Sequence, residues 1–337
     1  MKLYPKIAER IPQYQDMAEA IQNNLTPILA VGLSAVHKAH FIESTAASMS
    51  FTGKTIAVIA EDEQNAVKIA DDINNMSGAE MALHFPAKEF SFRQMEGRSR
   101  EYEYLRLGVL ARLAERSCKV VVMSAEAALQ LTIPATALTE NSIVLCTGNP
   151  YSLDQIITGL VAAGYARRPQ VDGIAQFSVR GGILDVYPPG ESAPVRIEFW
   201  GDEIDSISYF DPETQRREEN ADEIEISPAA EVMFDPPKLA AKLKTEIPNP
   251  ALTLKQRDIL AKDAELLENG VKIPPDRYIP LLDTMGAVFE YFGDSLLMLS
   301  ESGNMAERFK SIEIQLSADT ENYLEEGYLF SKTAKLQ

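Results

Sequence analysis

The chain has 337 residues, 45% of them hydrophobic, and this length favours two or three domains over a single core. Its 32 basic and 50 acidic side chains give a formal charge of −18, which argues against a chain that itself grips nucleic-acid phosphates. No apolar run reaches the roughly 20 residues of a membrane span, and the N-terminus lacks the apolar core of a secretory signal, so we expect a soluble cytoplasmic protein without membrane contacts.

Residues 1–138 alternate short apolar runs with amphipathic segments. This pattern is typical of a parallel sheet covered by helices and predicts an α/β domain. The predicted strands are Pro27–Val31, Thr55–Ala60, Met81–Phe85, Lys119–Ser124 and, just beyond this range, Ser142–Cys146. The predicted helices are Glu61–Met76 and Ser99–Arg116.

A loop similar to a phosphate-binding loop follows the first predicted strand. Compared with the pattern G-x-x-x-x-G-K-[ST], it keeps Gly32 and Lys38 but has His37 at the second glycine and Ala39 at the hydroxyl position. A side chain at position 37 obstructs the approach of phosphates to the backbone, and alanine cannot bind magnesium. We therefore expect a degenerate nucleotide loop that holds ATP poorly.

Residues 139–226 change character and read as antiparallel strands. Ser152 and Gln155 form a capping-box pair, which predicts a helix that ends at Gly164. Apolar and charged residues alternate in Val195–Phe199. Tight-turn candidates follow at Gly201-Asp202 and Asp211-Pro212. We therefore expect a small α+β domain with an antiparallel meander.

This middle region is strongly acidic, with 6 basic and 16 acidic side chains. Three of its basic residues nevertheless lie between Gly164 and Gly182, where the only acid is Asp172. These three residues are Arg167, Arg168 and Arg180. Arginine suits contacts with carboxylates because its planar guanidinium binds both oxygens at once. The sequence therefore predicts a local basic patch on an acidic domain.

The remaining residues, 227–337, contain prolines around helical patterns and an apolar strand at Ser295–Ser300. No motif along the chain predicts a catalytic or metal site, because a G-x-S-x-G elbow is missing and the histidines lack further ligands nearby. Cys118 and Cys146 each lie in an apolar, strand-like run, which predicts buried free thiols.

Three blocks of sequence occur in order and carry a family resemblance. They are RGGILDVYPPG from Arg180, VRIEFWGDEIDSISYFDPETQ from Val195 and EISPAAE from Glu225. They resemble the inserted domain shared by UvrB, the damage-verification subunit of nucleotide excision repair, and the N-terminal UvrB-homology region of bacterial transcription-repair coupling factor (Mfd). The resemblance implies a degenerate helicase-like parallel-sheet domain split between 1–138 and 227–337, with the α+β domain inserted at 139–226.

Departures from UvrB favour the coupling factor as the relative. Where a working helicase strand ends in Asp-Glu, this chain has Ser300-Glu301, so the metal-binding aspartate is missing as well as the loop hydroxyl. The stretch where UvrB inserts an aromatic-rich hairpin, residues 89–104 here, is short and runs directly into a helix. The resemblance therefore implies a fragment that is not itself an enzyme, with the ATP- and magnesium-dependent motor beyond Gln337.

The resemblance implies a binding role, because the inserted domain docks on UvrA, the damage-sensing ATPase, in both relatives. The module would recruit UvrA to RNA polymerase stalled at DNA lesions, while other domains of the full-length protein contact polymerase and DNA. By motif, the UvrA-binding residues are Arg180, Arg167 and Arg168, together with Phe177 in the strand that leads to Arg180. The family's first arginine position reads Ala166 here, and Arg167 would substitute for it.

Three alternatives stay open at this point. In the first, Arg180 serves only to pair with a local acid such as Asp185 across the sheet. In the second, the chain is a reduced UvrB-like ATPase or helicase that acts directly on damaged DNA, and it then binds an ATP analogue. In the third, the module restrains the motor through an intramolecular contact with the C-terminal region. This alternative is compatible with UvrA binding.

Overall fold

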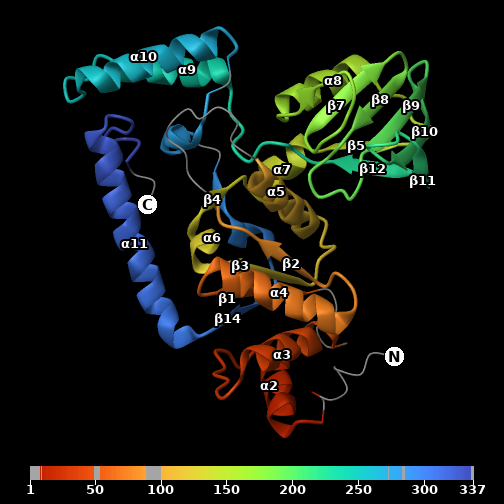
Figure 1. Cartoon of the computed structure of the whole chain (residues 1–337), viewed down its shortest axis with the longest axis vertical. Helices are drawn as coiled ribbons and strands as arrows, with labels where there is room; N and C mark the ends of the chain where they lie inside the picture. The colour runs from red at the N-terminus through yellow and green to blue at the C-terminus, as the bar shows by residue number, and fades with distance from the viewer. Residues whose placement is uncertain are drawn as a thin grey trace. The chain divides into compact units, whose positions relative to one another are not determined.

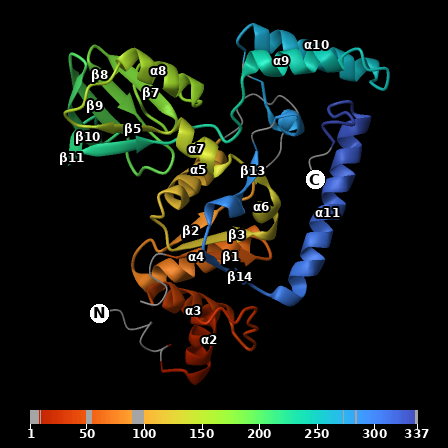
Figure 2. The same ribbon diagram turned by 180° about the vertical axis from the view of Figure 1, so that it is seen from behind.

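The computed structural model describes residues 8, 10–48, 54–88, 100–271, 273–282 and 285–334. Internal contacts divide the chain into two compact units, each assembled from three segments (Figures 1 and 2). Unit 1 comprises Met1–Ala87, Arg112–Gln130 and Val288–Ile312, and unit 2 comprises Lys88–Ala111, Leu131–Ala287 and Glu313–Gln337. The three-part division at residues 139 and 227 stays a prediction.

Unit 1 contains a four-stranded parallel sheet with the strand order β14-β1-β3-β2. The strands are β1 (Thr55–Ala60), β2 (Ala82–Phe85), β3 (Val120–Ser124) and β14 (Ser295–Leu299). β1 pairs with β3 on one side and, on the other, with β14 from near the end of the sequence. From Ile56 to Ala60 every residue of β1 is buried, as expected for a parallel strand covered on both faces.

Helices α3 and α4 cover one face of this sheet, as Figure 1 shows. The helices of unit 1 are α2 (Pro12–Gln22), α3 (Ala35–Ala47), α4 (Glu63–Ser77), α6 (Ala125–Leu129) and the 3-10 helix η3 (Val288–Tyr291). Asp62 caps the start of α4, where its carboxylate accepts a hydrogen bond from the Asn65 amide at 2.8 Å, and Gly78, in a left-handed conformation, caps its end. Ile69 and Ile73 on its inner side are buried in the same apolar cluster as β1 and β3.

Unit 2 contains a six-stranded sheet with the order β11-β10-β9-β8-β7-β6, antiparallel except for the parallel pair β6–β7. Its strands are β6 (Ala166–Arg167), β7 (Gln176–Arg180), β8 (Ile183–Val186), β9 (Val195–Trp200), β10 (Glu203–Phe210) and β11 (Arg217–Ala221). Helix α8 (Leu153–Ala162) begins after Ser152, as predicted, and packs on one face of the sheet through Ile156 and Leu160.

The rest of unit 2 consists of small sheets and helices. The two-stranded sheets pair β5 (Ile143–Cys146) with β12 (Glu223–Ile226) and β4 (Leu131–Thr132) with β13 (Gly286–Ala287). The helices are α7 (Ala135–Asn141), α9 (Pro236–Glu246), α10 (Leu254–Glu268) and the 3-10 helix η2 (Asp276–Leu281), with most of α5 (Glu101–Ala114) and the second half of α11 (Ser302–Glu325). α9 and α10 pack together through an apolar cluster that contains Leu243 and Leu260.

Most predicted elements are confirmed. Thr55–Ala60 forms β1 with the predicted bounds, and the meander of β9, β10 and β11 turns at Gly201 and after Asp211 as expected. Ser142–Cys146 forms the strand β5, but β5 pairs antiparallel with β12 in unit 2 and does not join the parallel sheet. The apolar run alone did not reveal its partner, because strand pairing depends on long-range contacts.

The predicted strand Pro27–Val31 is wrong. In the structure this segment has no regular secondary structure, and Leu29 and Val31 are 75% and 79% exposed. An extended segment becomes a strand only when a neighbour satisfies its backbone hydrogen bonds. Among the described residues, no backbone hydrogen bond of this segment to a neighbouring strand occurs.

Two further sequence predictions concern thiols and membrane contact. Cys118 is buried, which raises the pKa of its thiol to about 11, whereas Cys146 is only partly buried and donates a hydrogen bond to Glu223 at 3.3 Å. Both are free thiols, so the prediction of full burial holds for Cys118 alone. Within the described ranges, no helix has both the length and the apolar character that crossing a bilayer requires.

Helix α5 is tied to the six-stranded-sheet region within unit 2. The buried pair Arg106 and Glu231 joins the helix to the segment after β12, with Arg106 Nε 2.8 Å from the Glu231 carboxylate. Glu103 accepts a hydrogen bond from the Glu231 amide at 3.0 Å. Burial alone would raise the pKa of Glu103, but its bond with Arg100 holds that pKa below the ordinary value. These contacts fix α5 against the loop after β12.

A second contact, between two glycines, holds α5 close to the loop after β8. A Cβ added to Gly108 would lie 2.7 Å from the Gly190 Cα, so only glycine allows this approach. We predict that Gly108→Ala destabilises the fold by about 1–3 kcal/mol, because backbone must move to admit the methyl group. Denaturant unfolding measures this cost.

Gly303 provides the matched control, since it also lies in a helix and nothing is within 4 Å of a Cβ added there. Gly303→Ala is expected to be neutral or to stabilise the chain by up to about 1 kcal/mol. A Gly108→Ala variant as stable as the unsubstituted chain would contradict the close contact between α5 and Gly190.

Candidate protein-binding site

Strand alternation divides the side chains of the six-stranded sheet between two faces. One face carries apolar side chains such as Leu184 and Ile197 and is buried with α8. The other face, called the outer face below, carries mostly polar side chains. These are Ser178 and Arg180 of β7, Ile183 and Asp185 of β8, Arg196, Glu198 and Trp200 of β9, and Ser206 and Ser208 of β10.

Asp185 lies at the centre of the outer face and is fully buried. Its carboxylate accepts hydrogen bonds from Arg196 Nε at 2.7 Å and Arg196 Nη2 at 2.9 Å, and from Arg180 Nη2 at 2.7 Å. The Arg196 guanidinium also contacts the Gln215 side chain at 3.3 Å and lies 4.5 Å from the Phe210 ring centre. The bond with Asp185 raises the pKa of Arg196 above its ordinary value. A buried carboxylate requires such partners, because burial of an unpaired charge costs several kcal/mol.

Arg180 binds the same carboxylate but remains at the surface. Its side chain is 48% exposed, whereas that of Arg196 is 13% exposed. A guanidinium has five N–H donors, and within the described residues Arg180 makes one hydrogen bond. The local pairing that the sequence left open is therefore present, and Arg180 still keeps donors that a carboxylate of another protein can reach.

The other two arginines of the predicted basic patch lie at the edge of the same sheet. Arg167 ends β6, and both Arg167 and Arg168 are exposed. The parallel pairing of β6 with β7 places Arg167 opposite Phe177, and the Arg168 amide donates to the Phe177 carbonyl at 2.8 Å. Three residues of strand, roughly 10 Å, separate this position from Arg180. The three arginines thus lie near one edge of the sheet, but the register places the Arg167 side chain on the face of Phe177, opposite the face that carries Arg180.

The side chain of Phe177 does not belong to this surface. It is fully buried in the apolar cluster of the inner face. Phe177 and Arg180 are an odd number of residues apart in one strand, so their side chains point to opposite faces. The prediction that Phe177 contacts a partner directly is therefore wrong, and its role is to hold β7 on the core.

A second ion pair of the outer face was not predicted from the sequence. Glu198 of β9 pairs with Arg217 of β11, and the hydrogen bond from Arg217 lowers the pKa of Glu198. The alternation in Val195–Phe199 did place Arg196 and Glu198 away from the core. Their partners became known only from the register of the neighbouring strands.

The loop from Gly32 to Ala39 and the pair Ser300-Glu301 come together in unit 1. Lys38 lies in the first turn of α3, and its Nζ atom donates to Ser300 Oγ at 3.4 Å and forms an ion pair with Glu301. Ser300 directly follows β14, and its amide donates to the Ile59 carbonyl of β1 at 2.9 Å. The two motifs, 262 residues apart from Lys38 to Ser300, therefore meet, and a carboxylate of the chain itself pairs with the lysine.

Other positions of this loop differ from a phosphate cradle. Ala39 is fully buried in the apolar cluster under α3 and α4. His37 is exposed, and its ring Nδ1 lies 3.1 Å from Ser34 Oγ. Gly32 has a left-handed φ of 80°, which suits glycine. Ser34 is the N-cap residue of α3, but its hydroxyl makes no capping hydrogen bond to the helix backbone and contacts His37 instead.

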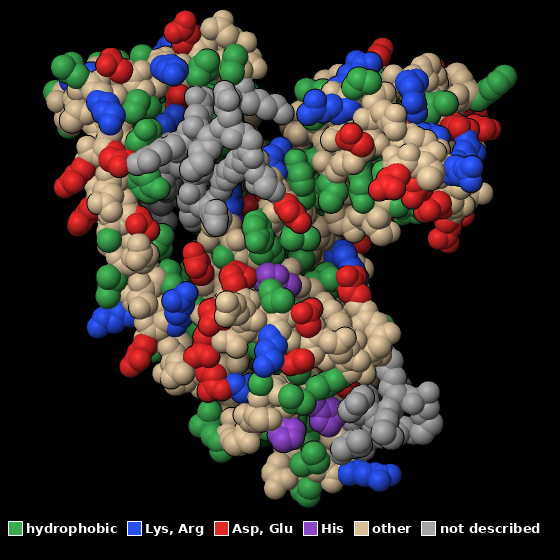
Figure 3. Space-filling model, viewed as in Figure 1, with side chains coloured by type: hydrophobic (Ala, Val, Ile, Leu, Met, Phe, Trp, Pro, Cys, Tyr) green, Lys and Arg blue, Asp and Glu red, His purple; other side chains and the backbone are tan. Residues whose placement is uncertain are grey.

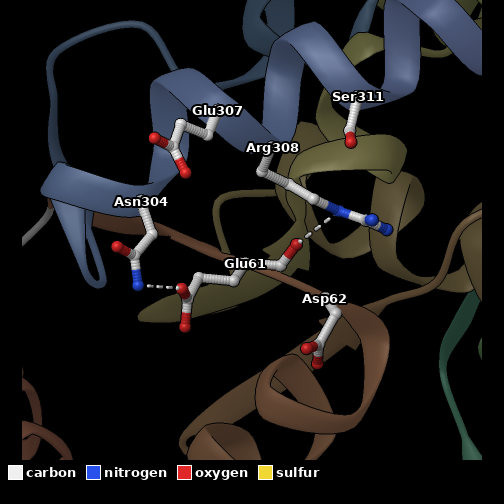
Figure 4. A pocket seen from close by; sticks show the side chains of 6 residues that line it. All are labelled: Glu61, Asp62, Asn304, Glu307, Arg308 and Ser311. Carbon is white, nitrogen blue, oxygen red and sulfur yellow. Dashed lines mark hydrogen bonds between the residues drawn. The ribbon is translucent and has the colours of Figure 1, made fainter.

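A polar hollow of about 350 Å³ lies beyond the carboxyl end of β1 (Figure 4). Its lining consists of Glu61, Asp62, Asn304, Glu307, Arg308 and Ser311. Asn304 Nδ2 donates to the Glu61 carboxylate at 2.9 Å, and Arg308 Nε donates to the Glu61 carbonyl at 3.1 Å. Ligands of open α/β sheets bind at this end of the strands. Three carboxylates against one guanidinium, however, make the hollow a poor place for phosphates.

Two other predictions concern a metal site and the stretch compared with the UvrB hairpin. In the described part of the chain, no group of three or more His, Cys, Asp or Glu side chains is arranged to hold a metal ion. Most of the stretch compared with the UvrB hairpin, residues 89–99, lies outside the described residues.

The sheet region of unit 2 is similar in sequence to a known domain family. Residues 143–232 match the family model described as UvrB interaction domain. Over 327 residues, or 93% of this chain, the sequence is 28% identical to the transcription-repair-coupling factor of Bacillus subtilis (strain 168). It is 26% identical over the same length to that of Staphylococcus aureus (strain USA300). The chain spans 28% and 27% of the length of these curated relatives.

These matches confirm the resemblance to the UvrB-homology region of transcription-repair coupling factor that the three sequence blocks predicted. The matched range contains every residue of the outer face, from Ser178 to Ser208, as well as Arg167 and Arg168.

We predict that the two arginines on Asp185 contribute unequally to stability. Arg196→Ala leaves Asp185 with one half-exposed partner and is expected to cost about 3–5 kcal/mol. Arg180→Ala leaves the two-pronged bond with Arg196 intact and is expected to cost under about 1 kcal/mol. Denaturant unfolding of both variants measures the difference. Equal costs would contradict the assignment of Arg196 as the main partner of Asp185.

Proposed function

We propose that this chain is a non-catalytic protein-binding module that recruits UvrA to RNA polymerase stalled at DNA lesions, in the cytoplasm. The observation that carries the proposal is a UvrB interaction domain whose outer face presents a half-exposed arginine on a rigid, buried carboxylate. As in the relatives, contacts with polymerase and DNA, and the ATP-driven motor, would belong to other parts of a longer protein.

The chemistry of the outer face supports a protein partner. Arg180 is held on Asp185, so little side-chain freedom is lost when a partner carboxylate binds it. Arg167 and Arg168 add exposed positive charge to an otherwise acidic domain. A planar guanidinium that is fixed in place at the surface is typical of an interface hot spot. Arg180 is therefore the central contact of the proposed site, and a partner that also wraps around the sheet edge would reach Arg167 and Arg168 there.

The nucleotide loop supports the non-catalytic part of the proposal. Glu301 neutralises the lysine that would bind phosphates, and Ala39 supplies no hydroxyl for magnesium. A nucleotide would have to displace Glu301 and would meet its negative charge next to its own phosphates. We infer that the helicase-like unit serves as a scaffold and requires neither ATP nor a metal ion.

We predict that Arg180→Ala weakens the complex of this chain with UvrA by about 2 kcal/mol, or roughly 30-fold. Arg167→Ala is expected to weaken it less, because this residue lies at the sheet edge. Isothermal titration calorimetry measures both. Arg216→Ala is the matched control, since Arg216 is also exposed in unit 2 but precedes β11, at the opposite edge of the sheet. If neither Arg180→Ala nor Arg167→Ala changed the affinity, the interface would be assigned wrongly.

We predict that a fluorescent ATP analogue does not bind this chain saturably, with or without magnesium, because Lys38 is already paired. Fluorescence anisotropy over a titration to millimolar chain concentrations measures this. Saturable binding that disappears in Lys38→Ala would favour the alternative function, a reduced UvrB-like ATPase that acts on damaged DNA.

A further inference from the structure

Trp200 is the only tryptophan of the chain, and it is 84% exposed. It ends β9, one residue before the turn at Gly201. Tryptophan gains much free energy when its large ring leaves water, so an exposed tryptophan at the end of a strand is a candidate contact when further observations point to a partner. Its ring makes no aromatic stacking or cation contact with the described residues.

Exposure along the outer face increases towards this end of the sheet. On β9, the side chain of Arg196 is 13% exposed and that of Glu198 is 28% exposed, and Trp200 reaches 84%. On β7, Ser178 is 2% exposed while the Arg180 side chain is 48% exposed. The loops before β7 and after β10 cover the closed end, where Ser178 Oγ donates to the Pro169 carbonyl at 2.9 Å. The other end of the outer face is open.

Trp200 and Arg180 lie at this same open end. The Phe199 amide donates to the Gly182 carbonyl at 2.8 Å, so the turn after Arg180 lies against the end of β9. A Cβ on Gly182 would lie 2.9 Å from the Phe199 carbonyl oxygen, which shows how closely the two segments pack. β7 and β9 are separated by one strand, and the register places Arg180 level with Glu198, two residues before Trp200. The two side chains therefore project from backbone positions about 12 Å apart.

The charges around Trp200 indicate which kind of partner surface would fit this side chain. The turn and strand that follow carry the exposed acids Asp202, Glu203 and Asp205. Figure 3 shows acidic side chains gathered over the part of the surface near β10 and β11. An aromatic ring bordered by carboxylates suits an apolar pocket with a Lys or Arg at its rim, because the cation can pair with the acids and lie over the ring.

We propose that Trp200 is the aromatic anchor of the outer-face interface and enters an apolar pocket with a basic rim on the protein that binds Arg180. This inference rests on the proposed function and names its second contact. A tryptophan flanked by a fixed arginine and a polar rim has the composition of an interface hot spot. The partner must accordingly present a carboxylate for Arg180 and, about 12 Å away, a pocket for an indole ring.

A single fluorine label tests this contact directly. Incorporation of 5-fluorotryptophan labels position 200 alone, because the chain has one tryptophan. Addition of unlabelled UvrA is expected to shift and broaden the ¹⁹F resonance and to abolish its solvent isotope shift, as burial of the ring requires. An unchanged resonance in a chain that calorimetry shows to be saturated with UvrA would overturn the inference and leave the proposed function standing.

Affinity measurements provide the second arm. Trp200→Ala is expected to weaken the UvrA complex at least tenfold, and Trp200→Phe less, because a smaller ring still fills part of the pocket. Leu254→Ala is the matched control, since Leu254 is also an exposed apolar residue of unit 2, at 78% exposure, but lies on α10. Wild-type affinity of Trp200→Ala beside a weakened Arg180→Ala would refute the anchor alone. Absence of any UvrA complex with the unsubstituted chain would refute both proposals.

Discussion

The buried carboxylate of Asp185 is the constraint on which the outer face of the sheet depends. A charge without access to water must be paired, and Arg196 meets this requirement with two hydrogen bonds. Because Arg196 supplies most of the compensation, Arg180 can share the same carboxylate while half of its side chain stays in water. The pairing that stabilises the sheet thus also fixes the orientation of an arginine that stays accessible at the surface.

The cations of the outer face and of the nucleotide-like loop are paired differently. On the outer face, Arg180 keeps donors at the surface of a strongly acidic domain, where a partner carboxylate can reach them. In the nucleotide-like loop, Lys38 is bound by Ser300 and Glu301 from the end of β14. A cation paired within its own chain attracts phosphates weakly, whereas a fixed, exposed guanidinium pays little entropy on binding. The cation of unit 2 is therefore open to an external acid, whereas the lysine of unit 1 is already paired within the chain.

Local patterns predicted the fold well where short-range physics determines it. The apolar run Thr55–Ala60, the cap at Ser152 and the turn at Gly201 all appear as expected, because propensity, capping and turn geometry are local properties. Pro27–Val31 and the partner of Ser142–Cys146 were predicted wrongly. A run of apolar residues does not state whether a neighbouring strand exists or on which sheet it lies.

By itself, the sequence determined the family resemblance, the acidic domain with its basic patch, and the presence of alanine at position 39 and serine at position 300. Only the tertiary structure decided that Phe177 is buried, that Lys38 meets Glu301, and that Asp185 holds two arginines of different exposure. It also decided that Trp200 lies at the open end of the face that carries Arg180. The physical reason is that side-chain identity is written along the chain, whereas burial and pairing depend on strand register and on contacts between distant residues.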